Sequence, residues 1–455
     1  MRNILIIGAG RSATSLIRYL IEKSSAENLH ITIGDISIES AQKLTKNHLN
    51  ATGILLDVFN KKQREEAVKA SDIVISMLPA RFHIEVAKDC ITFEKNLVTA
   101  SYISDEMQSL NEEVIDKGLV FMNEIGVDPG IDHMSAMQVI DTIRSKGGNV
   151  VLFESFTGGL IAPESDDNLW NYKFTWNPRN VVLAGQGGAA EFLQEGLYKY
   201  IPYNRLFRRT ELIKIKGHGE FEVYANRNSL KYQKVYGFKD ILTLYRGTIR
   251  RVGFSRAWNI FVQLGMTDDS YTIPNSEKLS YREYVNLFLP YSPTDSIELK
   301  LRHSLKIDQD DLIWKKLKEI DLFNGKKYLE IKNATPAQAL QKILMEKWAL
   351  AKEDKDMIVM YHKFGYELNG KNYQIDSSMV TIGEDQTYTA MSKTVGLPVA
   401  IAALQILNKK ITTPGVLRPI DKEVYKPILE ELETYGVQFN EKKKEYLGYN
   451  PNNLN

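Results

Sequence analysis

The sequence opens with MRNILIIGAGRSATSLIRYL, residues 1–20, and this stretch decides the fold. The apolar run at residues 4–7 predicts a buried strand, and GAGRSA at residues 8–13 fits the pattern G-x-G-x-x-G/A. Apolar residues then recur at helical spacing, which predicts a helix over residues 13–23. A glycine-rich turn between a strand and a helix is the context in which this pattern binds a dinucleotide.

Each small residue of this turn has a separate expected role. Gly8 permits a tight turn, Gly10 lets the backbone approach a pyrophosphate, and Ala13 lets the helix pack closely on the strand. At Ser12 and beyond, the free N–H groups and the positive end of the helix dipole favour the phosphates. The alternative interpretation is an ordinary strand–turn–helix junction.

The next hundred residues repeat this alternation of short apolar runs and amphipathic segments. Strands that are apolar on both faces and separated by helices are typical of a parallel sheet covered on two sides. The pattern predicts a doubly wound Rossmann domain over residues 1–125, with strands at residues 4–7, 31–33, 54–56, 73–76, 97–99 and 120–122.

Beyond residue 125 the alternation is lost, and aromatic, glycine and polar residues are mixed. Residues 126–265 and 351–385 predict a second α/β domain with a mixed, largely antiparallel sheet, whose strands lie near residues 150–156, 212–216, 220–225, 357–363 and 365–368. Residues 266–350 carry helical spacing and predict a helical insertion domain. Two further helices are expected at residues 386–407 and 422–435, before a polar tail. The charge run at residues 441–445 is expected to be a solvated face or part of this tail.

Asp35 ends the second predicted strand and indicates which dinucleotide is bound. A carboxylate there accepts hydrogen bonds from both adenosine ribose hydroxyls and repels a 2′-phosphate, and Ile36 after it offers no cation. We therefore expect NAD. Asp35 could instead cap the helix that begins near residue 38. Asp57 after the third strand could face the adenine, and Leu78 and Pro79 follow the fourth strand, where the sheet crevice receives ligands.

Asp128 lies just past the sixth strand, in GVDPGIDH, near the expected nicotinamide. A carboxylate there could accept a proton or bind an ammonium group, although Asp-Pro-Gly is also a good turn sequence. Arg227, Arg246 and Lys173 lie among aromatic residues of the second domain, and each could bind a substrate carboxylate.

Composition excludes several classes of protein. The 58 basic and 57 acidic residues give a net charge of +1, which removes the electrostatic case for nucleic acid or an anionic membrane surface. Cys90 is the single cysteine, so no intramolecular disulfide or CxxC zinc site is expected, and the seven histidines show no spacing of a metal site. No signal peptide or membrane span is apparent, and we expect a cytoplasmic protein.

Longer motifs resemble one enzyme family. The chain is similar to saccharopine dehydrogenase of the glutamate-forming type, also called saccharopine reductase, over nearly its whole length. The resemblance is carried by GAG at 8–10, ISMLPA at 75–80, ASYIS at 100–104, MNEIGVDPGIDH at 122–133, GGLIAPESDDNLWNYKFTW at 158–176, YANRNS at 224–229 and RGTIR at 246–250.

The resemblance implies a dimer and a reaction at the secondary amine of saccharopine that yields L-glutamate and 2-aminoadipate 6-semialdehyde. It places Asp128 and Tyr102 at the reacting end. It also places Arg227, Lys173, Arg246 and Thr248 in segments that bind the substrate's three carboxylates. The C-terminal helices within residues 386–455 would return to the Rossmann domain.

Two departures from the family pattern matter. Fungal members carry Cys-Arg-Thr after the second strand, where the arginine serves the 2′-phosphate of NADP, whereas this chain has Asp35, Ile36 and Ser37. We therefore expect NAD and the oxidative, lysine-degrading direction. Those members also have a cysteine in the stretch that matches residues 155–158, where this chain has Thr157, so a catalytic thiol is not expected.

Two other functions fit parts of the sequence. One is a carboxynorspermidine-type dehydrogenase of polyamine metabolism, whose pocket should offer acids rather than several cations. The other is a dinucleotide-binding sensor without turnover, which the intact PESDDN and YANRNS segments disfavour.

Overall fold

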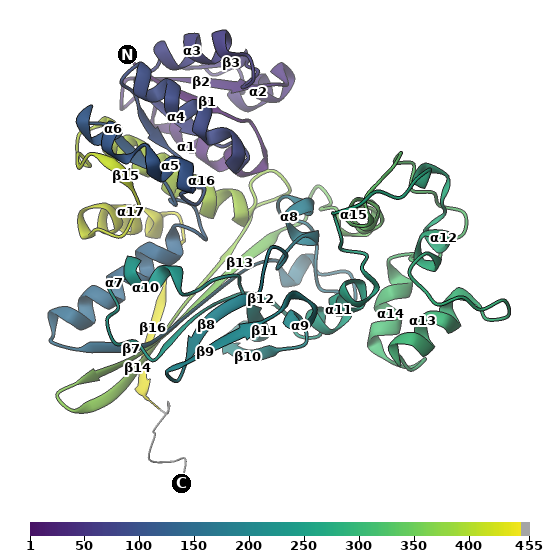
Figure 1. The fold of residues 1–455 in the computed structure, drawn as a ribbon. Helices are drawn as coiled ribbons and strands as arrows, with labels where there is room; N and C mark the ends of the chain where they lie inside the picture. The colour runs from purple at the N-terminus through teal and green to yellow at the C-terminus, as the bar shows by residue number, and fades with distance from the viewer. Residues whose placement is uncertain (447–455) are drawn as a thin grey trace. The chain divides into compact units, whose positions relative to one another are not determined.

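The computed structural model describes residues 1–446, which form two compact units (Figure 1). Unit 1 comprises Met1–Val150, Glu367–Lys371 and Met379–Lys442, and unit 2 comprises Val151–Tyr366, Asn372–Ser378 and, among the described residues, Lys443–Tyr446. Unit 1 is thus assembled from both ends of the chain. The residue boundaries of the three predicted domains stay a prediction.

Unit 1 is built on a seven-stranded sheet in the order β15-β6-β5-β4-β1-β2-β3, and every neighbouring pair is parallel. The predicted doubly wound architecture is confirmed, and all six predicted strands are present. The seventh strand, β15, was not predicted. The bounds are β1 Arg2–Ile7, β2 Leu29–Asp35, β3 Ala51–Leu55, β4 Ile73–Ser76, β5 Asn96–Val98, β6 Val120–Met122 and β15 Gly415–Leu417.

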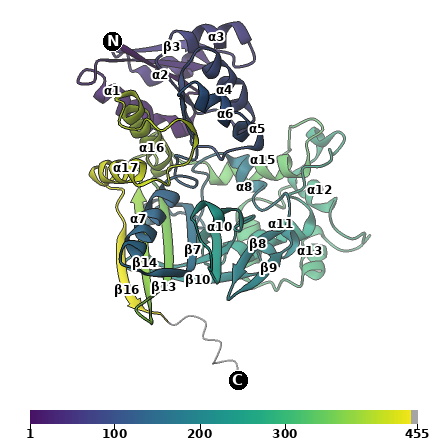
Figure 2. The same ribbon diagram turned by 60° about the vertical axis from the view of Figure 1, so that its left-hand side comes forward.

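Helices cover both faces of this sheet because its strands are apolar on both sides. One layer contains α1, α2 and α16, with α17 and α7 beside them, and the other contains α3, α4, α5 and α6 (Figure 2). The bounds are α1 Thr14–Lys23, α2 Ile38–Thr45, α3 Lys61–Lys69, α4 His83–Thr92, α5 Asp105–Ser109, α6 Asn111–Asp116, α7 Ile131–Ser145, α16 Ala390–Leu407 and α17 Lys422–Thr434, with the 3-10 turns η1 Arg11–Ala13 and η2 Ala80–Phe82.

Helix α16 is the central helix of its layer. Its length and mean hydropathy of 1.5 would let it cross a membrane, but 78% of it is buried inside the protein, as is typical of a core helix. It crosses α1 closely at Gly396, where an added Cβ would lie 2.9 Å from the backbone nitrogen of Leu16. A residue without a side chain is therefore required at this crossing.

Unit 2 contains most of a second sheet, which is mixed as predicted. Its order is β10-β11-β12-β7-β13-β14-β16, and the β8–β9 hairpin pairs with β12. Strand β12 is parallel to β7 and antiparallel to β11. The bounds are β7 Asn149–Ile161, β8 Ala190–Gln194, β9 Leu197–Ile201, β10 Thr210–Ile215, β11 Gly219–Ala225, β12 Thr243–Arg251, β13 Asp356–Leu368, β14 Lys371–Ile382 and β16 Asn440–Glu445.

The predicted helical insertion lies in unit 2 between α11 and β13 (Figure 1). The helices of unit 2 are α8 Pro178–Val182, α9 Tyr203–Leu206, α10 Lys231–Val235, α11 Phe254–Leu264, α12 Tyr281–Asn286, α13 Ile297–Leu305, α14 Leu312–Glu319 and α15 Pro336–Trp348, with the 3-10 turns η3 Pro163–Ser165 and η4 Ser276–Lys278. Side-chain oxygens at Ser280 and Thr335 cap α12 and α15 in complete capping boxes.

Several strands of the second sheet differ from the sequence prediction. Strands β8, β9, β12 and β14 were not predicted, and β13 is one strand where two were expected. The charge run expected as a solvated face or part of a polar tail forms β16, whose residues are exposed as predicted. The alternative of a tail was wrong because backbone hydrogen bonding to β14 needs no apolar side chains.

Replacing Gly396 by leucine is expected to destabilise unit 1 by about 2–3 kcal/mol, because the side chain would force α16 away from α1. Urea unfolding followed by circular dichroism measures the effect. Lys393→Leu, one turn earlier in α16 at a half-buried position, is the control and should change stability by less than about 1 kcal/mol. Equal effects of the two substitutions would contradict the close crossing.

Candidate active site

The glycine-rich turn between β1 and α1 is shaped to receive a phosphate. Gly8 has a φ of +107°, and an added Cβ would lie 3.0 Å from the carbonyl oxygen of Met77. At Gly10 an added Cβ would meet no atom within 4 Å, so open space lies beside the backbone. No side chain caps η1 or α1, so the first N–H groups are left for a ligand. Ser12 is half-buried and Ala13 is fully buried, which fits the third small position of the motif.

Asp35 at the end of β2 fixes this turn. One carboxylate oxygen accepts the N–H of Ala9 at 2.7 Å, and the other accepts the N–H of Ser37 at 2.9 Å. The cap of α2 is Ser37, whose hydroxyl accepts the N–H of Ser40, so Asp35 is not the helix cap. Ile36 is 72% exposed. These residues fit a dinucleotide, with Asp35 held at the place where an adenosine ribose is bound in this fold.

The other predicted dinucleotide residues lie after neighbouring strands of the same sheet. Asp57 follows β3 and is half-buried, and its carboxylate accepts the N–H of Phe59 at 2.9 Å. Leu78 packs on the apolar core beneath β4, and Pro79 is exposed and precedes η2. Their roles toward a cofactor stay predictions.

His83 connects the ends of β4 and β5, and it was not among the predicted site residues. Its Nδ1 lies 2.8 Å from the Ser76 hydroxyl, and its Nε2 lies 2.7 Å from the Ser101 hydroxyl and 3.2 Å from that of Thr99. The ring is 4% exposed, and burial lowers the pKa of His83 to about 4. His83 is therefore neutral at pH 7, and it joins the two loops through hydroxyl groups.

The Tyr102 hydroxyl donates to the carboxylate of Asp128 at 3.1 Å. Tyr102 is 46% exposed and Asp128 is half-buried, so both side chains are accessible. The structure thus pairs the two predicted catalytic residues, which come from the loops after β5 and β6. Both loops lie at the carboxyl ends of parallel strands, where ligands bind in this type of sheet.

Glu124 holds the Tyr102 loop from both sides. Its backbone N–H donates to the carbonyl of Ser101, and its carboxylate accepts the N–H of Ile103 at 3.1 Å. The same carboxylate accepts from Arg418 at 2.9 Å and lies 3.0 Å from Nε2 of His133. Burial raises the pKa of Glu124, but the hydrogen bond and charge of His133, helped by Arg418, outweigh burial and lower it overall. This buried carboxylate is therefore ionised.

In unit 2, Arg246 and Thr248 lie on one face of β12, since alternate residues of a strand share a face. Thr248 is directly opposite Thr157 of β7 and Tyr224 of β11. The hydroxyl of Thr157 is buried and has no hydrogen-bond partner among residues 1–446. A buried hydroxyl group on this face that forms no hydrogen bond to the protein fits a binding site for a polar ligand.

The other two predicted substrate-binding residues differ in their surroundings. Arg227 follows β11 and is exposed, and its backbone carbonyl accepts the N–H of Glu191. Lys173 is 3% exposed, and its ammonium donates at 2.8 Å to both Asp167 and Asp354. Burial lowers the pKa of Lys173, but these two carboxylates raise it overall. A substrate carboxylate would compete with both of them, and the role of Lys173 stays a prediction.

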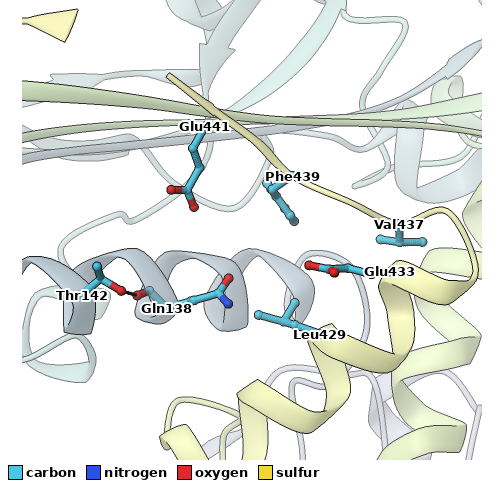
Figure 3. A pocket seen from close by; sticks show the side chains of 7 residues that line it. All are labelled: Gln138, Thr142, Leu429, Glu433, Val437, Phe439 and Glu441. Atoms are coloured by element: carbon cyan, nitrogen blue, oxygen red, sulfur yellow. Dashed lines mark hydrogen bonds between the residues drawn. The ribbon is translucent and has the colours of Figure 1, made fainter. Parts of the chain in front are cut away.

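Two further features carry no predicted site residue. A hollow in unit 1 is lined by Gln138 and Thr142 of α7, Leu429 and Glu433 of α17, and Val437, Phe439 and Glu441 (Figure 3). It offers two carboxylates and no cation, so it suits no anionic ligand. Cys90 is fully buried, as predicted, and burial raises the pKa of its thiol.

Comparison with known protein families finds a match for each of the two main parts of the chain. Residues 4–122 match the family described as the saccharopine dehydrogenase NADP binding domain, and residues 126–437 match the saccharopine dehydrogenase C-terminal domain. The chain belongs to the saccharopine dehydrogenase family.

Relatives of this family match nearly the whole chain. Saccharopine dehydrogenase [NADP(+), L-glutamate-forming] of Schizosaccharomyces pombe is 33% identical over 97% of this chain and 99% of its own length. The mitochondrial alpha-aminoadipic semialdehyde synthase of Mus musculus is also 33% identical, over 96% of this chain. The chain spans about half the length (47%) of that mouse relative.

Solved structures of the saccharopine dehydrogenase family and beyond share the fold. The apo saccharopine dehydrogenase (L-Glu forming) from Saccharomyces cerevisiae superposes with a TM-score of 0.88, 32% identity and coverage of 98% of this chain and all of that chain. The homospermidine synthase from Legionella pneumophila has a TM-score of 0.53, covers 98% of this chain and 92% of that chain, and is 11% identical, which shows a shared fold alone.

Lowering the pH from 7 to 5 is expected to reduce the unfolding free energy by about 2 kcal/mol through His83 alone. Unfolded His83, with its ordinary pKa near 6.5, takes up a proton in this range, whereas the folded ring, with a pKa of about 4, does not. This contribution is complete above pH 6.5 and is lost as the pH falls toward 4. Urea unfolding at both pH values measures it.

His83→Asn should remove this part of the pH dependence, while His30→Asn, at a half-buried position on β2, should keep it. A His83→Asn protein that loses stability as steeply as the wild type would contradict the neutral, buried ring.

Proposed function

We propose that this chain is a saccharopine dehydrogenase that uses NAD and forms L-glutamate and 2-aminoadipate 6-semialdehyde, in the lysine-degrading direction. The observation that carries the proposal is the hydrogen bond between the Tyr102 hydroxyl and Asp128 at the carboxyl end of the unit 1 sheet. The near full-length similarity to glutamate-forming saccharopine dehydrogenases supports the substrate.

The reaction sets clear requirements for the protein. The bridging secondary amine must lose its proton before the adjacent carbon gives up hydride, and water must then add to the resulting imine carbon. The carbinolamine loses the amine of glutamate and leaves the aldehyde. A bound nicotinamide supplies the hydride acceptor, and the turn at residues 8–13 with Asp35 would hold its dinucleotide.

Asp128 meets both proton-transfer requirements. Its carboxylate takes the proton of the secondary ammonium and passes it to solvent, and it then takes a proton from the attacking water, as a general base. It returns this second proton to the leaving amine of glutamate. The Tyr102 hydroxyl, hydrogen-bonded to Asp128, fixes the direction of that carboxylate. No nucleophilic thiol is needed, which agrees with the threonine at position 157 and the buried Cys90.

The substrate's three carboxylates need cations and hydroxyl groups. Arg227, Arg246 and Thr248 supply them in unit 2, and Lys173 adds a cation if Asp167 and Asp354 release it. A diamine substrate would instead need acids at these positions. The cationic character of this set supports saccharopine over a polyamine substrate.

The choice of NAD rests on the end of β2. Asp35 places a carboxylate where a 2′-phosphate of NADP would lie, and the exposed Ile36 offers no cation to offset the repulsion. The fission yeast relative is named for NADP(+), so this chain would differ from it in cofactor. We further propose a homodimer in the cytoplasm, with no nucleic acid or membrane partner.

Saccharopine is expected to reduce NAD at mildly alkaline pH, seen as absorbance of the reduced nicotinamide. Asp128→Asn should lower kcat by about 100- to 1,000-fold because the base is lost. Tyr102→Phe should lower it less, since the carboxylate remains. Asp105→Asn, an exposed acid on α5, is the control. Reduction with carboxynorspermidine only would favour the polyamine enzyme, and tight NAD binding without any turnover would favour the sensor.

Asp35→Ala should raise the KM for NAD by about 10- to 100-fold, because two hydrogen bonds to the ribose are lost. Adding Ile36→Arg should then favour NADP. Glu39→Ala, an exposed acid on the first turn of α2, is the control. Initial rates with each dinucleotide measure the preference. If the ratio of NAD to NADP efficiency stays the same, the account of this strand end is wrong.

A further inference from the structure

Arg250 is a buried cation that takes part in no ion pair among residues 1–446. Its side chain is 6% exposed. One terminal nitrogen donates to the carbonyl of Ile249 at 2.9 Å, while Nε has no hydrogen-bond partner. Glu222 is directly opposite on β11, but its two carboxylate oxygens accept the N–H groups of Gly253 and Ser255. A charge buried in this way is costly unless an anion joins it.

Aromatic rings surround this guanidinium. Its central carbon lies 5.2 Å from the ring centroid of Tyr172, 5.4 Å from that of Phe254 and 5.8 Å from that of Tyr224. The Tyr172 hydroxyl is also buried without a partner. The indole N–H of Trp348, whose ring lies 5.2 Å from that of Tyr172, has none either. Three hydrogen-bond donors, the Nε of Arg250, the Tyr172 hydroxyl and the Trp348 indole N–H, therefore lie among these aromatic rings without an acceptor.

The position of Arg250 connects it with the candidate substrate residues. Arg246, Thr248 and Arg250 alternate along β12 and therefore share one face of the sheet. Arg246 stacks its guanidinium on the ring of Tyr232, at 4.2 Å, whereas Arg250 ends the row inside the aromatic enclosure. A ligand lying along this face would reach Thr248 and then Arg250.

We propose that Arg250 and Tyr172 form a buried subsite for one carboxylate group of the substrate. A carboxylate supplies an anion in direct contact with Arg250 and two acceptor oxygens, one for the guanidinium and one for the tyrosine hydroxyl. A water molecule would satisfy the donors but not the charge. The subsite rests on the proposed function for the identity of its ligand, and it explains how a substrate with several carboxylates is preferred to a diamine.

The test uses Arg250→Met, which keeps the volume and removes the charge and the donors. In the full chain, its KM for saccharopine should rise about 100-fold while kcat changes less than threefold. Arg250→Lys should recover part of the loss. Arg251→Met is the matched control, because Arg251 is the next residue and faces the other side of the sheet. Its KM should stay within threefold of the wild type.

Thermal unfolding without ligand separates this role from a structural one. Removing an unpaired buried charge should leave the melting temperature of Arg250→Met unchanged or higher. A structural cation stacked on aromatic rings predicts the reverse, with a lower melting temperature and an unchanged KM. That result would overturn the proposal.

Calorimetry distinguishes failure of the subsite from failure of the proposed function. If the wild type does not oxidise saccharopine, the proposed function fails, and L-glutamate and glutarate are then titrated into the wild type and Arg250→Met. Binding that is lost in Arg250→Met alone supports the carboxylate subsite. Equal binding by both proteins, or binding by neither, overturns it.

Discussion

The contacts of one buried carboxylate, Glu124, hold together the loops at the carboxyl end of the unit 1 sheet. It bonds to the residues on either side of Tyr102, to His133 of α7 and to Arg418 after β15. Three segments far apart in the sequence therefore meet at one charge. Because the Tyr102 loop has only short backbone pairing of its own, the direction of its hydroxyl toward Asp128 depends on this carboxylate remaining ionised.

His83 supports the same loop by a different kind of interaction. Its contacts are with hydroxyl groups, which can donate or accept, and its ring is neutral because burial lowers its pKa to about 4. Neutral hydrogen bonds add no net charge to the loop, whereas a charged imidazolium would lower the basicity of a nearby carboxylate. The loop is thus fixed by one charged group and one neutral group.

The sequence predicted the parts of the fold whose signals are local. Strands β1–β6 are short apolar runs between helices, and the glycine-rich turn follows a fixed pattern. Strand β12 was not predicted because its arginines are typical of a surface segment, although they are buried in the structure. Strand β15 was not predicted because it has only three residues. The placement of Tyr102 and Asp128 at the same end followed from family resemblance, whereas their hydrogen bond was not predicted. The contacts of His83 and Glu124 could not be foreseen, since their partners lie up to 294 positions away.

The way unit 1 is assembled has a consequence for synthesis on the ribosome. The guanidinium of Arg2 donates to the carbonyl of Leu407, 405 positions later, and α16 covers α1. Until α16 has emerged, the apolar face of α1 has no cover, and the edge of β6 stays unpaired until β15 follows. Unit 2 is a continuous stretch by comparison and can form its core first. The middle of the chain is therefore made, and can fold, before the N-terminal part of unit 1 is completed, although that N-terminal part leaves the ribosome earlier.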